Sequence, residues 1–392
     1  MEGDRKYITA DELKQHSKPG DLWISIQGKV YNVSDWAKEH PGGEIPLLNL
    51  AGQDVTDAFI AYHPGTAWKH LDNFFTGYYL EDFEVSEVSR DYRRLVSEFV
   101  KTGLFEKKGH VAFCSLASVA VMFLAVLYGV LRCDSVWAHL GSAMVLGMLW
   151  MQSTYVGHDS GHYQVMASRG YNKLAQIITG NFDPLARFLI SFQHWTFYPV
   201  MCVARVNLYL QTLLLLFSPS RQVPDRALNI MGILVFWSWF PLLLSYLPNW
   251  PERFMFVLAS FAVTSIQHIQ FCLNHFSANV YVGPPSGNDW FEKQTSGTLD
   301  IACSSWMDWF FGGLQFQLEH HLFPRLPRCQ LRKVSPVVKE LCKKHNLPYR
   351  SLSFWDANVS TIRTLRTAAL QARDLSNPVP KNLLWEAVNT HG

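Results

Sequence analysis

Long apolar runs divide the chain into a polar front and a membrane part. Residues 111–131 carry no formal charge, and residues 136–156, 230–247 and 254–273 form three more apolar stretches. A helix of about 20 apolar residues spans the hydrocarbon core of a bilayer. The pattern therefore predicts about four transmembrane helices, arranged as two hairpins that each return the chain to the side from which it came.

Two further segments are expected to lie outside these spans. Residues 206–217 are apolar but too short to cross a bilayer, so we expect an interfacial or re-entrant helix there. Residues 84–109 are rich in charge and predict a solvated linker helix. Its basic end, at Lys107 and Lys108, lies just before the first apolar run, as cytosolic flanks do. We therefore expect both termini to face the cytosol.

The front of the chain has a different periodicity. Residues 22–26 and 29–33 alternate between apolar and polar positions like two short strands, with Gln27 and Gly28 as the turn. This predicts a small α+β domain, followed by an all-α membrane domain. The expected boundaries are residues 1–83 for the first domain, 84–109 for the linker, and 110–392 for the membrane domain with a cytosolic C-terminal cap.

Charge separates the same two modules. Only 17% of the 392 residues are charged and 48% are hydrophobic, which favours membrane embedding over a soluble globule. Residues 1–88 hold fifteen Asp and Glu against seven Lys and Arg, a net charge of −8, whereas the whole chain is at +2. The seven scattered cysteines, with no paired spacing, predict reduced thiols. The polar start has no apolar signal region, so we expect targeting by the internal spans.

The strongest candidate site is the run from Gln317 to His321. Gln317, His320 and His321 stand at positions i, i+3 and i+4, which share one face of a helix. Imidazole nitrogens suit iron, and a single helix cannot surround a metal ion. A metal site here therefore needs ligands from elsewhere in the chain.

Three upstream histidines can supply such ligands. His158 and His162 form an i, i+4 pair after the second apolar run, and His275 follows the fourth. Two closed hairpins bring all of these positions to the membrane face that the C-terminal cap occupies. We therefore predict that they share one iron site beside the bilayer, with Asp159 and Glu319 hydrogen bonded to the metal-bound histidines.

A second metal chemistry is expected in the front domain. His40 lies in the run His-Pro-Gly-Gly, and His63 precedes another proline. Two imidazoles on opposing loops suit a haem with both axial positions filled, which transfers electrons rather than binding oxygen. Apolar side chains are expected to line this pocket: Leu47, Leu48, Leu50, Val55, Phe59, Phe74 and Phe75.

These motifs resemble known families. Roughly the first eighty residues resemble cytochrome b5, whose haem ligands match His40 and His63. The whole chain resembles the b5-fused front-end membrane desaturases, and it looks most like the plant sphingolipid long-chain-base Δ8 desaturases. The segments 223–229 and 310–316 carry the closer likeness. His158 to His162 match the family's first histidine box, and Gln317 to His321 match the third, in which Gln replaces the usual leading His.

The resemblance implies a function, cofactors and partners. The implied activity is O2-dependent introduction of a Δ8 double bond into sphingoid long-chain bases at the endoplasmic reticulum membrane, with haem b and a non-haem di-iron site. An NADH-cytochrome b5 reductase is the implied electron donor, the substrate is a lipid of the bilayer, and no nucleic acid is implied. The near relatives are the acyl-lipid Δ6 desaturases.

One departure from the family pattern bears on activity. The family has a second box, HxxHH, beyond the first, whereas this chain has no histidine between His162 and His194. Five imidazoles remain for two irons, which need about eight ligands. We interpret the gap as an internal deletion at Asn181 and Phe182 that leaves the site incomplete. Alternatives are an inactive, membrane-anchored b5-type electron carrier, a dead desaturase subunit that pairs in a dimer with an intact homologue, and a b5-fused lipid hydroxylase.

Overall fold

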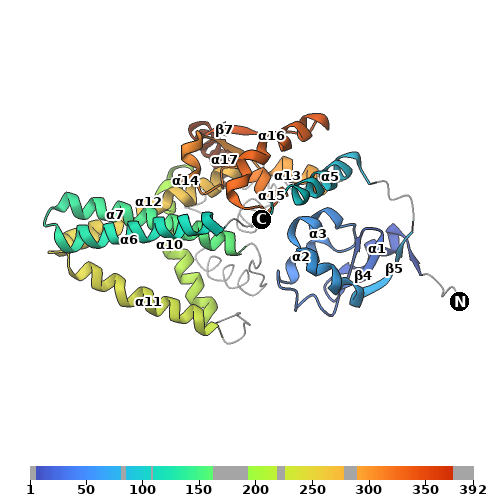
Figure 1. Ribbon diagram of the computed structural model, residues 1–392, viewed down its shortest axis with the longest axis horizontal. Coiled ribbons are helices and arrows are strands. Elements are labelled where there is room, and N and C mark those ends of the chain that lie inside the picture. Colours follow the sequence, from blue (N-terminus) through green and yellow to red (C-terminus); the bar gives the residue numbers. More distant parts are fainter. Residues whose placement is uncertain are drawn as a thin grey trace.

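The computed structural model describes residues 6–80, 85–106, 109–161, 193–218, 226–277 and 289–373. Over these ranges the chain forms an α+β domain, a bundle of long helices, and a cap that lies between them along one side (Figure 1). We use "cap" for residues 289–373 together with the helix α5, Glu87–Lys101.

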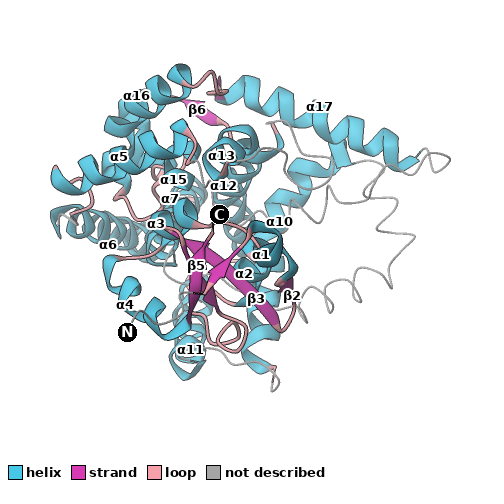
Figure 2. Cartoon of the chain, turned by 90° about the vertical axis from the view of Figure 1, so that its right-hand side faces the viewer, coloured by secondary structure: helices cyan, strands magenta, loops and turns pink. Residues whose placement is uncertain are grey.

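The N-terminal domain confirms the predicted α+β class. Its five-stranded sheet has the order β1-β5-β4-β3-β2, and only the β1–β5 pairing is parallel. The strands are β1 Tyr7–Ile8, β2 Ser17–Lys18, β3 Asp21–Ile26, β4 Lys29–Asn32 and β5 Phe75–Tyr79. The helices are α1 Ala10–Gln15, α2 Glu44–Leu50, α3 Thr56–Tyr62 and α4 Trp68–Leu71, with short 3-10 turns at η1 Gly65–Ala67 and η2 Asp72–Phe74. Figure 2 shows the strands near the centre of the view, with α5, α16 and α17 of the cap above them.

The predicted hairpin is present. β3 and β4 pair from Trp23 with Asn32 to Ile26 with Lys29, which leaves Gln27 and Gly28 as a two-residue turn. Both turn residues have positive φ, 49° and 74°, as a tight turn that follows the twist of the strands requires.

An apolar cluster under α2 and α3 forms the expected pocket. It contains Leu47, Leu48, Leu50, Val55, Phe59 and Phe74. Phe75, which was also expected to line the pocket, is not part of this cluster. It is the first residue of β5, its side chain is 43% exposed, and its ring packs beside that of Tyr78.

The expected solvated linker is instead a packed element of the cap. On α5 the apolar positions recur at helical spacing and form one buried face: Val88, Tyr92, Leu95, Val96 and Phe99. That face joins the core of the cap, which also holds Leu318, Leu322 and Phe323. The charges that suggested a linker occupy only the outer face.

The bundle contains helices near all four predicted spans. These are α6 Gly109–Arg132, α7 Val136–Gly161, α11 Arg226–Ser245 and α12 Trp250–Phe276. Among the described residues, three helices are long and apolar enough to cross a membrane, at Phe113–Arg132, Arg226–Ser245 and Trp250–His275. The helix α7 is not among them, since residues such as His139 and Gln152 lower its hydropathy. It packs instead against both α6 and α12.

The α7–α12 contact depends on a glycine. A Cβ at Gly147 would lie 2.6 Å from the carbonyl oxygen of Ser260 and 2.6 Å from Cβ of Val263. Only a residue without a side chain allows the two helices to approach this closely.

The interpretation of residues 206–217 as a separate short helix was wrong. They form the second half of α10, Gln193–Phe217, a 25-residue helix that contains Pro199 and packs on α12. The first half of α10 contains polar residues, so a search for uninterrupted apolar runs finds only its second half.

The cap follows α12. Its elements are α13 Trp290–Gly297, β6 Asp300–Ala302, η3 Ser305–Met307, α14 Asp308–Phe311, α15 Gln317–Leu322, α16 Arg328–Lys344, β7 Ser351–Ser353 and α17 Phe354–Arg373. The strands β6 and β7 pair in parallel. Every residue of α15 is buried, because α5, α13 and α16 pack around it.

Candidate functional site

The structure brings His40 and His63 together. His40 lies in the loop before α2, and His63 ends α3. Their ring centroids are 5.8 Å apart. Because a metal–imidazole bond is about 2 Å long, this spacing accommodates one metal ion between the two rings.

Backbone carbonyls set the orientation of both rings. Nδ1 of His40 lies 2.8 Å from the carbonyl oxygen of Gly43, and Nδ1 of His63 lies 3.2 Å from that of Phe59. A carbonyl can only accept, so each Nδ1 carries the proton and each Nε2 keeps its lone pair for a metal. A Cβ at Gly42 would lie 2.9 Å from Cε1 of His40, so a larger residue there would displace the ring.

Burial keeps both imidazoles neutral. It lowers the pKa of His40, and it lowers the pKa of His63 to about 4, with smaller contributions from His40 and from the Arg325 guanidinium. Neutral rings in an apolar pocket, with Nε2 available, fit a haem held by two histidines.

In the cap, Gln317, His321 and His275 converge. The amide nitrogen Nε2 of Gln317 lies 3.0 Å from Nε2 of His321 and 3.3 Å from Nε2 of His275. The ring centroids of His275 and His321 are 5.4 Å apart, and those of His320 and His321 are 6.2 Å apart. The structure thus brings together side chains from the end of α12 and from α15.

A glutamine that the sequence pattern did not single out orients one of these rings. Oε1 of Gln294, on α13, lies 2.9 Å from Nδ1 of His321. This oxygen can only accept, so Nδ1 of His321 donates and its Nε2 is left with a lone pair that faces Gln317 and His275. Imidazole nitrogens fit iron, whereas Gln317 turns its amide NH2 group toward them and would have to present its carbonyl oxygen to bind a metal ion.

Glu319 has a different environment from the one expected. Its Oε1 lies 3.0 Å from the Tyr349 hydroxyl, which also lies 2.8 Å from Oδ2 of Asp300. Oδ1 of Asp300 accepts from the backbone N–H of Leu318 at 3.0 Å and so anchors the start of α15. Burial, with the adjacent Asp300 carboxylate, raises the pKa of Glu319 well above its usual value, and burial also raises the pKa of Asp300, which favours a proton held between the two carboxyl groups.

The first box is only partly described. His158 lies in the last turn of α7, while His162, which follows that helix, lies outside the described residues. Within the described part of the chain, no three His, Cys, Asp or Glu side chains are grouped closely enough to hold a metal ion. The joining of the first box to the His275 and His321 cluster therefore stays a prediction, as does the ligand role of His320.

A further buried histidine, His139, has a structural role that its contacts explain. Nδ1 of His139 lies 2.6 Å from Oε2 of Glu252, and its Nε2 lies 2.9 Å from the carbonyl oxygen of Cys133. These contacts join the start of α7 to the start of α12, so His139 holds two helix ends together.

An apolar cavity of about 490 Å³ lies between α10, α12 and the cap. Its lining includes Ile266, Ile269, Phe310, Phe311 and Phe354. At its edge the Tyr198 hydroxyl donates to Oδ1 of Asn358 at 2.8 Å. Its size and lining suit a hydrocarbon chain.

Comparison with known proteins agrees with this geometry. Residues 9–80 match the cytochrome b5-like heme/steroid binding domain, and residues 196–353 match the fatty acid desaturase family. A relative described as Delta(8)-fatty-acid desaturase 2, from Arabidopsis thaliana, is 65% identical over 444 positions that cover 99% of both chains. The chain belongs to the cytochrome b5-fused fatty acid desaturases. This desaturase is thus an oxidoreductase of lipid metabolism with an electron-transfer domain and a membrane domain.

Two further proteins are similar to all or part of this desaturase. An acyl-lipid (9-3)-desaturase from Borago officinalis is 54% identical, with 99% of each chain covered. Among solved structures, a cytochrome b5 of Ostreococcus tauri virus 2 is similar to 19% of this chain at 26% identity, with 96% of the viral chain covered and a TM-score of 0.18.

Proposed function

We propose that this desaturase family member derives from an enzyme that introduces a Δ8 double bond into sphingoid long-chain bases. The observation that carries the proposal is the convergence of Gln317, His321 and His275, in a chain that also brings His40 and His63 together and holds an apolar cavity. The higher identity to the Delta(8) relative, 65%, than to the acyl-lipid (9-3) relative, 54%, favours Δ8 over the alternative Δ6 acyl-lipid activity.

The proposed activity needs two metal sites, one for haem and one for non-haem iron. His40 and His63 would hold haem b, which supplies single electrons. His275, Gln317, His320 and His321 would contribute ligands to a non-haem iron site, which supplies the oxidising power needed at an unactivated C–H bond. Gln294 fixes the ring of His321, and Asp300 fixes the start of the helix that carries it. Phe310, Phe311 and their neighbours would exclude water from the lipid chain.

We further propose that the loss of the second histidine box impairs this chain. The alignment with the Arabidopsis relative runs over 444 positions, and the chain has only 392 residues, so a segment of that relative has no counterpart here. Assigning this gap to the junction of Asn181 and Phe182 accounts for the missing box. With too few imidazoles, a pair of irons cannot be held at bridging distance. The alternatives are an inactive, membrane-anchored electron carrier and a dead desaturase subunit that pairs with an intact homologue.

Location and electron supply follow from the same proposal. We place the desaturase in the endoplasmic reticulum membrane with both termini in the cytosol, since basic residues flank the first span. An NADH-cytochrome b5 reductase would deliver electrons to the acidic N-terminal domain.

The test is expression in a yeast host that lacks Δ8 desaturase, followed by analysis of its sphingoid bases. The 392-residue chain should give no Δ8 product, whereas a chain with the family's missing segment restored should give it. In the restored chain, His320→Ala should abolish product and the exposed control His70→Ala should not. Clear Δ8 product from the unrestored chain, with about two irons per molecule, would show that the ligand count is wrong. A restored chain that forms only a Δ6 acyl product would support the alternative activity.

A further inference from the structure

The N-terminal domain is docked on the cap through α3, the helix that ends at His63. On its first turn, Asp57 is buried and Oδ1 lies 2.5 Å from Nε of Arg93 on α5. The second oxygen of Asp57 accepts a short hydrogen bond from the Ser89 hydroxyl, also on α5. An ion pair with an added hydrogen bond, mostly out of solvent, fixes this end of the helix.

The other end of α3 meets the cap through aromatic packing. The ring of Tyr62 lies edge-on to that of Trp290 on α13, with centroids 6.4 Å apart. Trp290 in turn packs on Tyr92 of α5 at 5.5 Å. Ile60 packs against the same apolar cluster, so the inner face of α3 continues the core of the cap.

Arg325 closes the contact next to the haem ligand. Its Nε donates to the carbonyl oxygen of Ala61 and its Nη2 donates to that of Ile60, each at 3.1 Å. In a longer helix the Ile60 carbonyl would accept from the N–H of residue 64, but that residue is Pro64, which has none. The guanidinium supplies the missing donor and places its positive charge at the negative end of the helix dipole.

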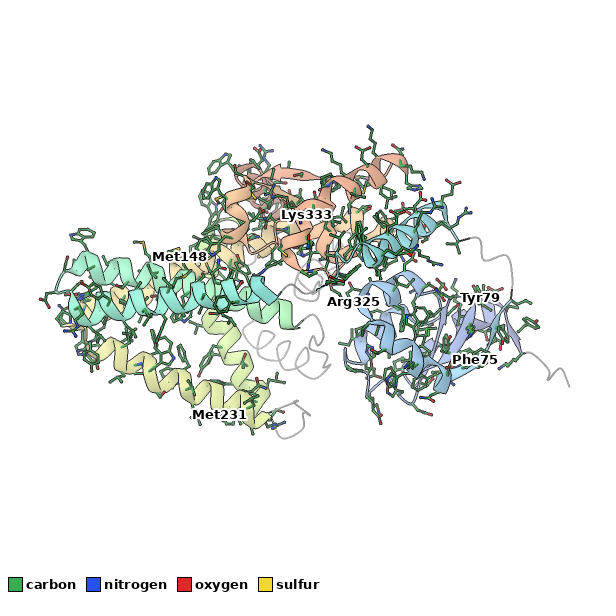
Figure 3. All side chains as sticks on the ribbon, viewed as in Figure 1. Phe75, Tyr79, Met148, Met231, Arg325 and Lys333 are labelled. Atoms are coloured by element: carbon green, nitrogen blue, oxygen red, sulfur yellow. The ribbon has the colours of Figure 1, made fainter. Side chains whose placement is uncertain are left out.

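The position of Arg325 in the sequence links the two metal sites. It lies four residues after His321, and the carbonyls that it binds lie two and three residues before His63. One short route, made of backbone, side chain and two hydrogen bonds, therefore joins a ligand of the haem to a ligand of the non-haem site. Figure 3 shows Arg325 at the junction of the cap and the N-terminal domain, while Lys333 lies higher on the cap, away from that junction in this view.

We propose that Arg325 is the positioning residue that docks the haem domain on the cap and raises the reduction potential of its haem. The proposal rests on the proposed function for its purpose, which is electron delivery within one chain. Haem held by His40 and His63 would supply one electron at a time, non-haem iron held in the cap would accept it, and Arg325 would neither gain nor lose a proton. Reduction adds a negative charge beside His63, and a nearby fixed positive charge stabilises that added electron.

The test uses the full-length, haem-loaded protein in lipid nanodiscs without substrate. Two quantities are measured: the haem midpoint potential, by spectroscopic redox titration, and the hydrogen exchange of the α3 amides. Arg325→Gln should lower the midpoint potential and increase α3 exchange about tenfold, because hydrogen bonds from a charged donor are lost. Lys333→Gln removes one exposed positive charge from the same cap and serves as the matched control, with both values expected to stay at wild type.

A conservative variant separates docking from charge. Arg325→Lys keeps the charge but cannot bind two carbonyls with one planar fork, so α3 exchange should rise while the potential stays nearer to wild type. Arg325→Gln values that match those of Lys333→Gln would overturn the proposal. Should Arg325→Gln fail to retain haem, Arg325→Lys decides alone, and unchanged α3 exchange would count against docking. These readouts need no lipid product, so failure of the Δ8 activity leaves them interpretable.

Discussion

Tyr92 offers a sharp test of the packing that holds the third histidine box. Tyr92 lies on α5, is fully buried, and donates from its hydroxyl to the carbonyl oxygen of Leu322 at 2.8 Å. Leu322 is the last residue of α15, so this hydrogen bond satisfies one of the open carbonyls at that helix end. The change Tyr92→Phe removes the hydroxyl and leaves the ring.

The free-energy cost of Tyr92→Phe comes from the Leu322 carbonyl, which loses its hydrogen-bond donor. A buried carbonyl that loses its donor costs about 1–3 kcal/mol. The ring keeps its contacts with Phe291 and Phe323, at centroid distances of 5.7 and 5.6 Å, so no cavity is added. Tyr92→Ala removes the ring as well, and its cost should rise to about 3–5 kcal/mol.

Hydrogen exchange of the α15 amides in the full chain is the assay, because a multidomain membrane protein has no single free energy of unfolding. Tyr92→Phe should speed this exchange about 5- to 150-fold. The matched control is Ser97→Ala, which removes one hydroxyl from the exposed face of the same helix and should change little. Equal exchange in both variants would refute the assignment of α5 to the cap.

Three more predictions concern the remaining modules. In the full chain, His40→Ala should abolish the visible spectrum of a low-spin bis-histidine haem, and the exposed control His70→Ala should keep it; undiminished haem in the first variant would contradict the ligand assignment. Haem reduction by a cytochrome b5 reductase should slow as salt rises, since residues 1–88 carry a net charge of −8 and attraction is screened beyond about 8 Å at physiological salt; a salt-independent rate would argue against electrostatic docking. Gly312→Ala should lower the temperature at which half of the protein is retained, because φ is +63° and a Cβ would lie 2.4 Å from the Tyr155 ring. The control Gly141→Ala meets no atom within 4 Å and should be neutral or stabilising in a thermal retention assay.

Local patterns in the sequence predicted the parts of the fold that depend on nearby residues. The β3–β4 hairpin follows from alternation and a Gln27-Gly28 turn, and the facing of His40 and His63 follows from two short loop motifs. The convergence of Gln317 and His321 follows from the i, i+4 rule for one helix face.

The rest depends on tertiary contacts that no local pattern encodes. Gln294 and Tyr349 carry no motif, and they reach His321 and Glu319 only because the cap folds around α15. The many charges on the outer face of α5 led to its interpretation as a solvated linker. A count of apolar positions at i, i+3 and i+4 could have revealed its buried face. The contact between the haem domain and the cap could not be predicted from the sequence. Arg325 makes this contact with backbone carbonyls, and because every residue has one, they leave no pattern in the sequence.

The parallel pairing of β6 with β7 has a consequence for the order in which this protein can be made. Asp300, which anchors the start of α15, lies on β6, and its partner strand is residues 351–353, which are synthesised after the whole third box. Tyr349, which binds both Asp300 and Glu319, is also synthesised after the box. A nascent chain that ends soon after His321 therefore holds Gln317, His320 and His321 but not the surroundings that orient them. Biosynthesis must continue past the box by about one more helix and strand before these side chains can take their final arrangement, so a transcript truncated in that interval would encode the third box and still lack its geometry.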